Sequence, residues 1–393
     1  MTNIPIPHQS GIVLFAKRPG VTSFSSLFSI KRALGTKKVG HTGTLDSFAS
    51  GLLVVCTGSL TRLASYITSF NKTYDAVIEF GVETDTLEYT GKIIKTAPLP
   101  KKDDVLSAIK HYTGDILQTP PLFSALHING ERASDIARSG RSAEMPSRPV
   151  TVYASEAEEF LFEDGRVKAV RVRFSVSKGT YIRSLARDIG SYCKSAAHLA
   201  GLRRLSVGSF RLEDAAGFSS LAPFTIQSVY ETISDMQKTQ SASCKAAASE
   251  HTPHSGEDEK DIQSEVRKKM QTMTESLAAE CGFGTAHIFP EYEDDFKHGR
   301  PLSSSMFEKK ADGLCAADDA TAVHGTCTAS GEKSGGVCSP SDVFSANDVS
   351  SGSGTCASGG EGAIAVFGKH GNFLGMILRR GAGAYSYEFV VPD

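Results

Sequence analysis

The sequence predicts an α+β fold in which helices flank a mixed, largely antiparallel sheet, followed by a small C-terminal β module interrupted by disordered insertions. Strand-like and helix-like segments are mixed without strict alternation, which is typical of α+β folds. Two long strand-like runs meet at Asp164-Gly165, a dipeptide that favours a tight hairpin turn. Beyond residue 236 the chain becomes polar, and apolar segments return only in short stretches.

The first 80 residues contain clear periodic patterns. GIVLFA (11–16) and LLVVC (52–56) are apolar runs of strand length. Residues 23–34 carry apolar side chains at helical spacing and start with a serine suited to capping. SLTRLASYI (59–67) is expected to form another helix. KTYDAVIEF (72–80) alternates between apolar and polar residues, as a half-buried strand does.

The segments that follow complete the predicted sheet and its helices. Residues 102–111 have a helical pattern, and residues 151–177 read as a hairpin. YIRSLARDIGSYC (181–193) follows as a helix, and GLRRLSVGSF (201–210) as a closing strand. We therefore expect the main sheet to end near residue 215.

Composition divides the chain into three parts. Residues 1–236 are predicted to form the main domain, and residues 237–286 a polar linker. Residues 287–393 are predicted to form the small β module, with a disordered insertion at about 303–362. That insertion is rich in Ser, Gly and Ala, so it cannot bury enough apolar surface to offset the entropy of ordering.

The overall composition is that of a soluble globular protein, with 40% hydrophobic and 22% charged residues. No apolar stretch approaches the roughly 20 residues that a membrane span needs. The start, MTNIPIPHQS, has neither a basic region nor an apolar core, so we expect no secretory signal and a cytoplasmic protein. The eight cysteines form no zinc-binding spacing, so we expect no metal.

Charge is distributed unevenly along the chain. Residues 237–362 contain 11 basic and 20 acidic residues, which leaves 31 basic against 24 acidic residues elsewhere. The part that is expected to fold is therefore basic. Such an excess is compatible with a polyanionic partner, although many soluble domains carry a similar charge for solubility alone.

One loop stands out as a candidate site. GHTGTLDSFASG (40–51) places Asp46 among glycines, which allow tight or left-handed backbone conformations. Asp46 is a candidate catalytic carboxylate, and its alternative role is that of a turn or helix-capping residue. A phosphate-binding loop is a weaker alternative, because the Lys-Ser/Thr pair of such loops does not follow the glycines.

This loop and three further blocks resemble the TruB-type tRNA pseudouridine synthases of bacteria. GHTGTLDSFASGLLVVCTG resembles their catalytic signature, and KTYDAVIEFGVETDTLEYTG resembles their K-x-Y strand and G-x-x-T-D-T turn. SKGTYIRSLARDIG and AHLAGLRRLSVGSF resemble their GTYIR segment and LRR strand. The four blocks occur in family order. Two departures are AKRPG in place of D-K-P-x-G, and Ser47 in place of a proline that would stiffen the loop.

The resemblance implies a pseudouridine-synthase fold, with residues 1–236 as the catalytic domain, and a reaction without cofactor. This reaction breaks the C1′–N1 bond of a uridine, turns the uracil and rejoins it through C5. Breaking a glycosidic bond builds positive charge on the sugar, which a carboxylate can stabilise or trap. By resemblance, Asp46 is that carboxylate, Arg183 pairs with it, and Tyr74 stacks on the base. How Asp46 acts stays open, because attack on C1′, addition to the base and removal of a sugar proton are not distinguished by the sequence.

The resemblance also suggests substrate-binding residues. His41 would insert among flipped-out bases, and Leu202 would line the uracil pocket. Gly43 and Lys17 complete this predicted set. Residues 119–149 correspond to an RNA-clamping insertion. Basic residues near the site would contact phosphates; they are Lys17, Lys31, Arg32, Lys37, Lys38, Arg203 and Arg204.

The expected substrate is the uridine at position 55 in the T-loop of tRNA, bound through the T-arm by a monomer. One alternative is a synthase working inside a guide-RNA ribonucleoprotein, for which basic tails are expected, whereas the tail region here is acidic. The other alternative is a non-catalytic tRNA-binding or tRNA-folding protein. The joint presence of Asp46, Tyr74 and Arg183 argues against it.

Overall fold

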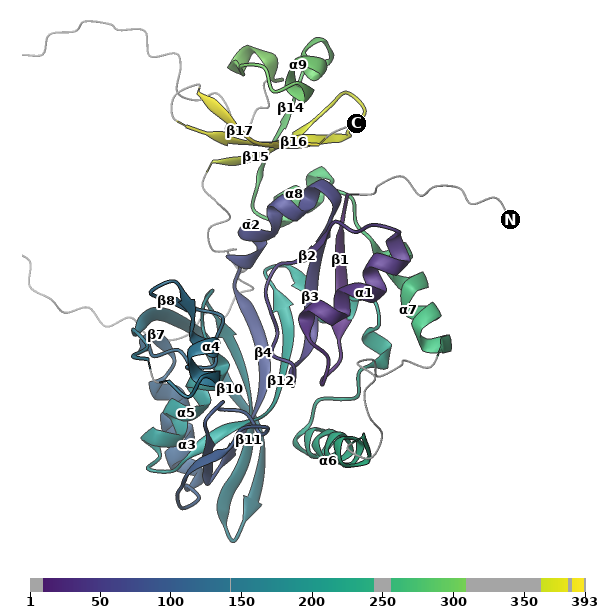
Figure 1. Cartoon of the computed structure of the whole chain (residues 1–393). Coiled ribbons are helices and arrows are strands. Elements are labelled where there is room, and N and C mark those ends of the chain that lie inside the picture. The colour runs from purple at the N-terminus through teal and green to yellow at the C-terminus, as the bar shows by residue number, and fades with distance from the viewer. Residues whose placement is uncertain (1–9, 142, 244–255, 309–361, 381–383, 392–393) are drawn as a thin grey trace, which may run out of the picture.

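A computed structural model describes residues 10–141, 143–243, 256–308, 362–380 and 384–391. A large twisted sheet with helices on both faces forms the main body, and a smaller sheet lies beyond one end of it (Figure 1). The α+β class and the mixed, largely antiparallel sheet predicted from the sequence are both confirmed, because a single parallel pair, β3 with β12, occurs in the large sheet as described.

The large sheet has nine strands in the order β1-β3-β12-β4-β11-β10-β7, with β2 paired to β3 and β13 paired to β12. In that order they are β1 (Ile12–Lys17), β3 (Ser50–Thr57), β12 (Ala197–Val207), β4 (Lys72–Phe80), β11 (Arg166–Val176), β10 (Arg148–Glu163), β7 (Gly114–Gln118), β2 (Val39–His41) and β13 (Phe210–Arg211). The central strands β12 and β4 lie between the Asp46 loop and the hairpin of β10 and β11.

Helices cover both faces because the central strands bury side chains on both sides. On β4, Ala76 and Ile78 pack with helices α3 (Lys102–His111) and α5 (Ile182–Tyr192). Val77, which points the other way, packs with α6 (Ile226–Ser243). The side chains of β3 also alternate between the two faces. Those on one face contact α1 (Ser23–Leu34) and α7 (Gly256–Lys269), and those on the other face contact α2 (Ala64–Thr68) and α8 (Glu275–Glu280).

Most predicted elements occur within one or two residues of their expected bounds. Helix α1 covers 23–34, but its cap is Thr22, whose side chain accepts a hydrogen bond from the Ser25 amide at 3.1 Å. The predicted serine cap is therefore wrong. Ser23 contacts the Asp46 loop instead, because its hydroxyl is directed away from its own helix. The hairpin turn at Asp164-Gly165 is confirmed, with both residues at positive φ.

The remaining elements are short. Strands β5 (Val82–Thr84) and β6 (Ile93–Thr96) pair with each other. The segment predicted as an RNA clamp, 119–149, contains β8 (His127–Ile128), β9 (Glu131–Arg132) and α4 (Ala133–Arg138). The 3-10 helices are Gly58–Leu63, Leu212–Asp214, Phe218–Ser220, Pro290–Tyr292 and Ser304–Met306.

The segment 237–286, expected to be a polar linker, contains packed structure. Ile262 and Val266 of α7 are buried against α1, and Arg267 donates a hydrogen bond to the Ala33 carbonyl at 2.8 Å. Helix α8 packs into a cluster with β3 residues. Two apolar residues one helical turn apart are enough to dock a polar helix, which explains why composition did not reveal it.

The C-terminal module is a four-stranded sheet in the order β14-β15-β16-β17. The strands are β14 (Gly284–His287), β15 (Ala363–Phe367), β16 (Phe373–Arg379) and β17 (Tyr385–Val390), and α9 (Glu293–Lys297) lies beside them. Its residues share a hydrophobic cluster with β3 and α8, so the module packs on the main body. Most of the predicted insertion at 303–362 lies outside the described residues.

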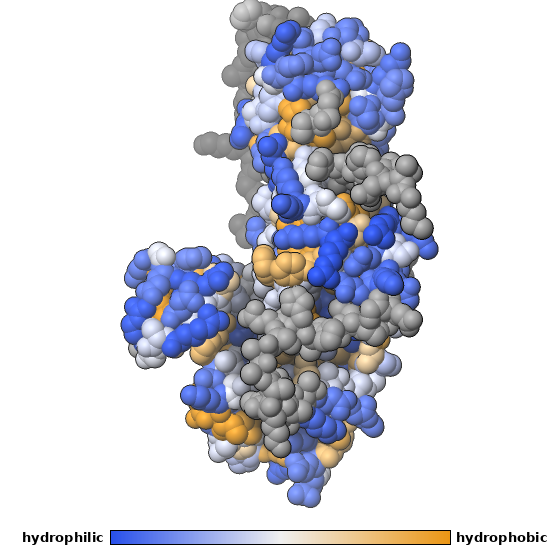
Figure 2. Space-filling view, turned by 45° about the vertical axis from the view of Figure 1, so that its right-hand side comes forward, coloured by the Kyte–Doolittle hydropathy of each residue, from blue (hydrophilic) through white to orange (hydrophobic). Residues whose placement is uncertain are grey.

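The surface is largely hydrophilic on the face in Figure 2, where the apolar residues form small, separate areas. Among the described residues, no helix is long and apolar enough to cross a membrane.

Candidate active site

The Asp46 loop connects β2 to β3 and is tied to the neighbouring elements by backbone contacts. The Ser23 hydroxyl donates to the Leu45 carbonyl at 3.0 Å and accepts from the Leu45 amide at 2.9 Å. The Ser47 carbonyl accepts a hydrogen bond from the Gly20 amide at 2.8 Å. The loop is therefore fixed on both sides of Asp46, although Ser47 stands where a proline was expected.

Arg183 at the start of α5 forms an ion pair with Asp46. Its Nε lies 3.0 Å from Oδ2 of Asp46, and its Nη2 donates a hydrogen bond to Oδ1 at 3.2 Å. The Nε contact is an ion pair without hydrogen-bond alignment. Nη1 and Nη2 also donate to the carbonyls of Thr86 and Phe123, both at 2.9 Å. The pairing expected from the sequence is present.

The pair is asymmetric in exposure. The Arg183 side chain is 7% exposed, whereas the Asp46 side chain is 36% exposed. A buried guanidinium thus holds a carboxylate that remains accessible to a ligand. Such a contact with a planar guanidinium orients the carboxylate.

Two buried basic side chains donate hydrogen bonds to backbone carbonyls of the loop and of β3. Lys17 of β1 is fully buried, and its Nζ donates to the carbonyls of Ala49 at 2.5 Å and Ser47 at 3.2 Å. Arg204 of β12 donates to the carbonyls of Leu52 at 2.8 Å and Gly43 at 3.0 Å. The phosphate contacts expected for Lys17 and Arg204 do not fit this burial. Gly43 offers its carbonyl to Arg204.

Burial also changes the acid–base behaviour of Lys17. Desolvation lowers the pKa of Lys17 to about 7, with Asp46 opposing this shift and Arg204 adding to it. The charge of Asp46 therefore acts on the Lys17 amine across the loop.

Tyr74 and Leu202 lie in one hydrophobic cluster with the residues that flank the ion pair. This cluster includes Leu45, which precedes Asp46, and Ile182, which precedes Arg183. Leu202 also lines a cavity of about 580 Å³ beside the loop, together with Phe48 and residues of α6. The fold therefore gathers the predicted Asp46, Arg183, Tyr74 and Leu202 around one region of the sheet.

His41 ends β2 at the start of the loop. Burial lowers the pKa of His41, and the Arg204 cation lowers it further. Its Nδ1 is buried without a hydrogen-bond partner among the described residues. Both effects disfavour the protonated imidazolium.

Glu88 is a second acidic residue near the ion pair, and our sequence reasoning gave it no role. Burial raises the pKa of the Glu88 carboxyl; Arg183 opposes this shift, and Asp46 adds to it. Tyr181 also senses Arg183 and Asp46, and burial raises its pKa. Both residues belong to quoted blocks, TDTLEYTG and GTYIR, so their position inside those blocks was the available signal. Within the described ranges, no group of three potential ligands could hold a metal ion.

The fold is similar to that of solved complexes of the protein Cbf5. The structure titled "Crystal Structure of a Cbf5-Nop10-Gar1 Complex" matches with a TM-score of 0.54 and 20% identity, over 97% of this chain and 85% of that chain. An archaeal box H/ACA sRNP Nop10-Cbf5 complex matches with a TM-score of 0.53 and 20% identity, over 99% and 88%. The chain therefore has the fold that these Cbf5 structures share.

Sequence comparison identifies the family. The model of the TruB family pseudouridylate synthase N-terminal domain matches residues 31–182. Relatives named tRNA pseudouridine synthase B are 46% identical in Treponema denticola, over 54% of this chain and 64% of that protein, and 41% in Borreliella burgdorferi strain ZS7, over 58% and 80%. The protein of that name from Treponema pallidum strain Nichols is 36% identical, over 76% and 87%. The chain belongs to the TruB family of pseudouridylate synthases.

Proposed function

We propose that this protein isomerises the uridine at position 55, in the T-loop of tRNA, to pseudouridine. The observation that carries the proposal is the Asp46 carboxylate, partly exposed and held by the buried Arg183 guanidinium. The relatives' name, tRNA pseudouridine synthase B, supports tRNA as the substrate. The T-loop position rests on the resemblance of the sequence blocks.

In this proposal, Asp46 stabilises or traps the positive charge that develops on the sugar when the C1′–N1 bond breaks. Arg183 orients the carboxylate, because the guanidinium is itself fixed by the carbonyls of Thr86 and Phe123. Tyr74 and Leu202 contact the uracil. The detached base turns and bonds to C1′ through C5; C5 then loses its hydrogen as a proton and N1 gains a proton, so the net change is an isomerisation that needs no cofactor or metal.

A base inside folded RNA has to be extruded before it can enter such a site. We propose that His41 contacts the extruded bases with its neutral ring, and that the segment 119–149 clamps the RNA. Gln118 and Thr119 anchor the base of that segment on α5, since the Gln118 side chain contacts the Tyr181 backbone and the Thr119 carbonyl accepts from Ser184. We further propose that the protein acts as a monomer, in the cytoplasm, where its substrate tRNA is found.

The test uses purified protein and an unmodified tRNA transcript without guide RNA. Because pseudouridine and uridine have the same mass, the product is derivatised with a carbodiimide that remains attached only to pseudouridine, and every uridine is then mapped by mass spectrometry. We expect modification at position 55 alone, and none in a transcript that has cytidine there. The alternative of a guide-dependent synthase predicts no product without a guide RNA. A non-catalytic tRNA-binding protein would bind the transcript and leave every uridine unchanged.

A further inference from the structure

Asp75 follows Tyr74 on β4 and points to the opposite face of the sheet, because successive side chains of a strand alternate. It is 4% exposed. Arg173 of β11 donates to both carboxylate oxygens of Asp75, at 2.8 and 3.1 Å, and Arg171 donates to one of them at 3.3 Å. A buried carboxylate therefore sits directly behind the residue proposed to contact the base.

Arg203 lies between this carboxylate and Ser50 of the Asp46 loop in the sheet. In β12 it is in register with Asp75 on one side and with Ser50, the first residue of β3, on the other. Its Nε donates to the Ser50 hydroxyl at 3.0 Å, and its Nη1 donates to the Ala222 carbonyl at 2.8 Å. Its pKa is lowered to about 10 by burial, and Asp75 opposes that shift.

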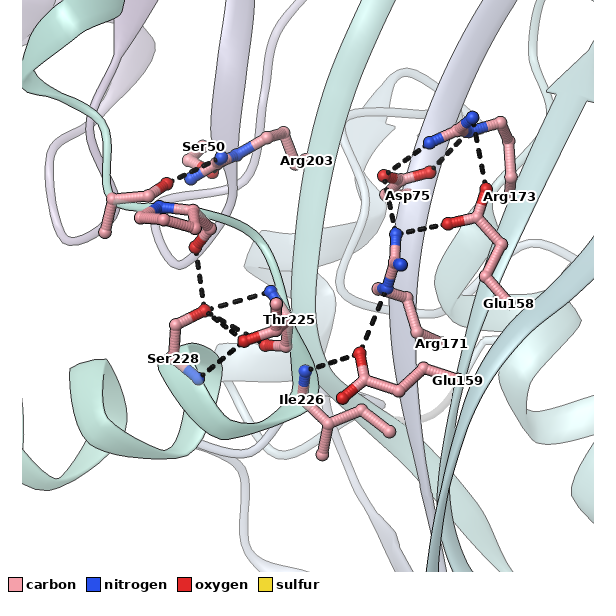
Figure 3. A network of polar contacts seen from close by, with 12 residues as sticks. Ser50, Asp75, Glu158, Glu159, Arg171, Arg173, Arg203, Thr225, Ile226 and Ser228 are labelled. Carbon is pink, nitrogen blue, oxygen red and sulfur yellow. Dashed lines mark hydrogen bonds and ion pairs between the residues drawn. The ribbon is translucent and has the colours of Figure 1, made fainter.

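The polar contacts continue to helix α6, as Figure 3 shows. Glu158 and Glu159 of β10 both contact Arg171, and Glu159 also accepts a hydrogen bond from the Ile226 amide at 3.1 Å. Thr225 and Ser228 cap the same end of α6. We call Ser50, Arg203, Asp75 and Arg173 the reverse-face row. This row spans four strands, and the contacts of Arg171 and Glu159 also link it to helix α6.

The next row of the sheet carries the proposed chemistry. Arg204, adjacent to Arg203, is in register with Tyr74 on one side and with Gly51 on the other. Each member of the reverse-face row from Ser50 to Asp75 is therefore the chain neighbour of a residue in the active-site row. Because the two rows consist of adjacent residues on the same strands, contacts that fix the strand register in one row also fix it in the other.

We propose that Asp75 and Arg203 are positioning residues, which hold Tyr74 and the Asp46 loop in a common register from the reverse face of the sheet. The inference rests on the proposed function for its kinetic readout. Asp75, which is 4% exposed, acts through its chain neighbour Tyr74. Arg203 was expected from the sequence to contact a phosphate, but its guanidinium donates to Ser50 and Ala222 instead, and it acts through its chain neighbour Arg204. Loss of either one leaves the catalytic groups present but displaced, and displacements of about 1 Å can lower rates about 100-fold.

The experiment compares Asp75→Asn and Arg203→Met with the wild type in single-turnover pseudouridylation, in tRNA binding, and in hydrogen–deuterium exchange of residues 42–51. We expect the rate to fall at least about tenfold and the tRNA Kd to change less than about twofold. Exchange in the loop should accelerate in both variants. The double variant should be no more than about threefold slower than the slower single variant, because both changes break one row.

Glu79→Gln is the matched control. Glu79 lies on the same strand and face as Asp75. Its partners are Lys168 at 3.4 Å, His198 at 4.0 Å and the Tyr230 hydroxyl of α6, and no contact with the reverse-face row is seen among the described residues. This variant should keep its rate and its loop exchange within about twofold of the wild type. Ser50→Ala provides a milder break of the row if Asp75→Asn does not fold, and it should also slow turnover and accelerate loop exchange.

The proposal is overturned if folded variants of the row keep wild-type rates and exchange, or if Glu79→Gln is impaired equally. Additive losses in the double variant would also contradict it. A wild-type protein that leaves tRNA unmodified would refute the proposed function instead, and loop exchange would still decide whether the row positions Asp46.

Discussion

Arg183 makes more contacts than an ion pair with Asp46 requires. Its two terminal nitrogens also bind the carbonyls of Thr86 and Phe123, so one guanidinium links the Asp46 loop to two other segments. This arrangement needs several donors in a planar fork, which a lysine ammonium lacks. The residue therefore fixes the carboxylate in place.

Arg183→Lys should therefore slow turnover although the charge is kept. Loss of one or two hydrogen bonds to charged groups, worth about 3 kcal/mol together, corresponds to a rate about 100-fold lower. We expect the tRNA Kd to stay within about threefold, because affinity resides mainly in phosphate contacts. Single-turnover kinetics and filter binding measure the two quantities, and a rate within tenfold of wild type would refute the role of the fork.

Lys17 should make the free energy of unfolding depend on pH. Burial lowers its pKa from 10.5 to about 7 in the folded protein. Between those two pH values the unfolded chain binds the extra proton and the folded protein does not. The free energy of unfolding therefore rises with pH across this window.

Lys17→Met removes that contribution. The difference in free energy of unfolding, wild type minus variant, should increase by about 2 kcal/mol from pH 7 to pH 9, at about 1.4 kcal/mol per pH unit at most. Urea denaturation at the two pH values measures it. A difference that is constant or falls as the pH rises would show that Lys17 titrates normally.

At the residue scale, the sequence predicted that Asp46 and Arg183 pair, but it did not reveal the buried residues that hold their loop in place. Asp46 and Arg183 stand in blocks whose order identifies the family, so their pairing was predictable. Lys17 and Arg204 were expected to contact phosphates, because a sequence does not tell a buried cation from an exposed one. Glu88 was missed because its proximity to Arg183 arises only when the chain folds.

At the scale of elements, β3 and β12 approach each other closely at Gly51. This glycine has φ +112°, and a Cβ there would lie 2.3 Å from the Arg204 carbonyl oxygen. A side chain therefore meets both backbone strain and a backbone atom that cannot move freely. The parallel contact that places Arg204 under the Asp46 loop depends on this residue.

Gly51→Ala should lower the free energy of unfolding by about 3 kcal/mol or more, combining strain and overlap. Gly35→Ala is the control, since Gly35 also has positive φ, +62°, but nothing lies within 4 Å of its Cβ position. The control should lose only about 1 kcal/mol. Equal losses in denaturant titrations would mean that the close approach to Arg204 is not what excludes a side chain.

Sequence patterns predicted the regular elements better than the packing between them. The helix at 102–111 and the strand at 72–80 have the bounds expected from periodicity. Helix α7 was read as linker, because its docking depends on Ile262 and Val266 within an otherwise polar segment. The match between those residues and α1 is a tertiary property that local composition does not contain.

At the scale of the whole molecule, we expect RNA binding to depend on the exposed cations. Lys37 and Lys38, just before the Asp46 loop, are exposed, whereas Lys17 and Arg204 are buried. Surface cations near the site can reach phosphates and release counterions, and buried cations cannot. The acidic balance of residues 237–362 lies in a separate part of the chain.

The tRNA affinity should fall steeply with salt. Each neutralised phosphate contributes about −0.7 to −0.9 to the slope of log K against log salt. Lys37→Gln with Lys38→Gln should make the slope shallower by about 1.5, whereas Lys17→Gln should leave it unchanged. Fluorescence anisotropy at several salt concentrations measures these slopes, and equal slopes for all variants would place the RNA elsewhere.

The central claim is that one partly exposed carboxylate, Asp46, converts a uridine of tRNA to pseudouridine. Asp46→Asn removes the charge and keeps the volume, so the fold and most of the tRNA affinity should remain. The decisive measurement is the amount of pseudouridine formed at position 55 of an unmodified transcript by wild type and by Asp46→Asn, with folding checked by circular dichroism. We predict stoichiometric product for the wild type and none for Asp46→Asn; product formation by the variant within about tenfold of the wild-type rate would contradict the account.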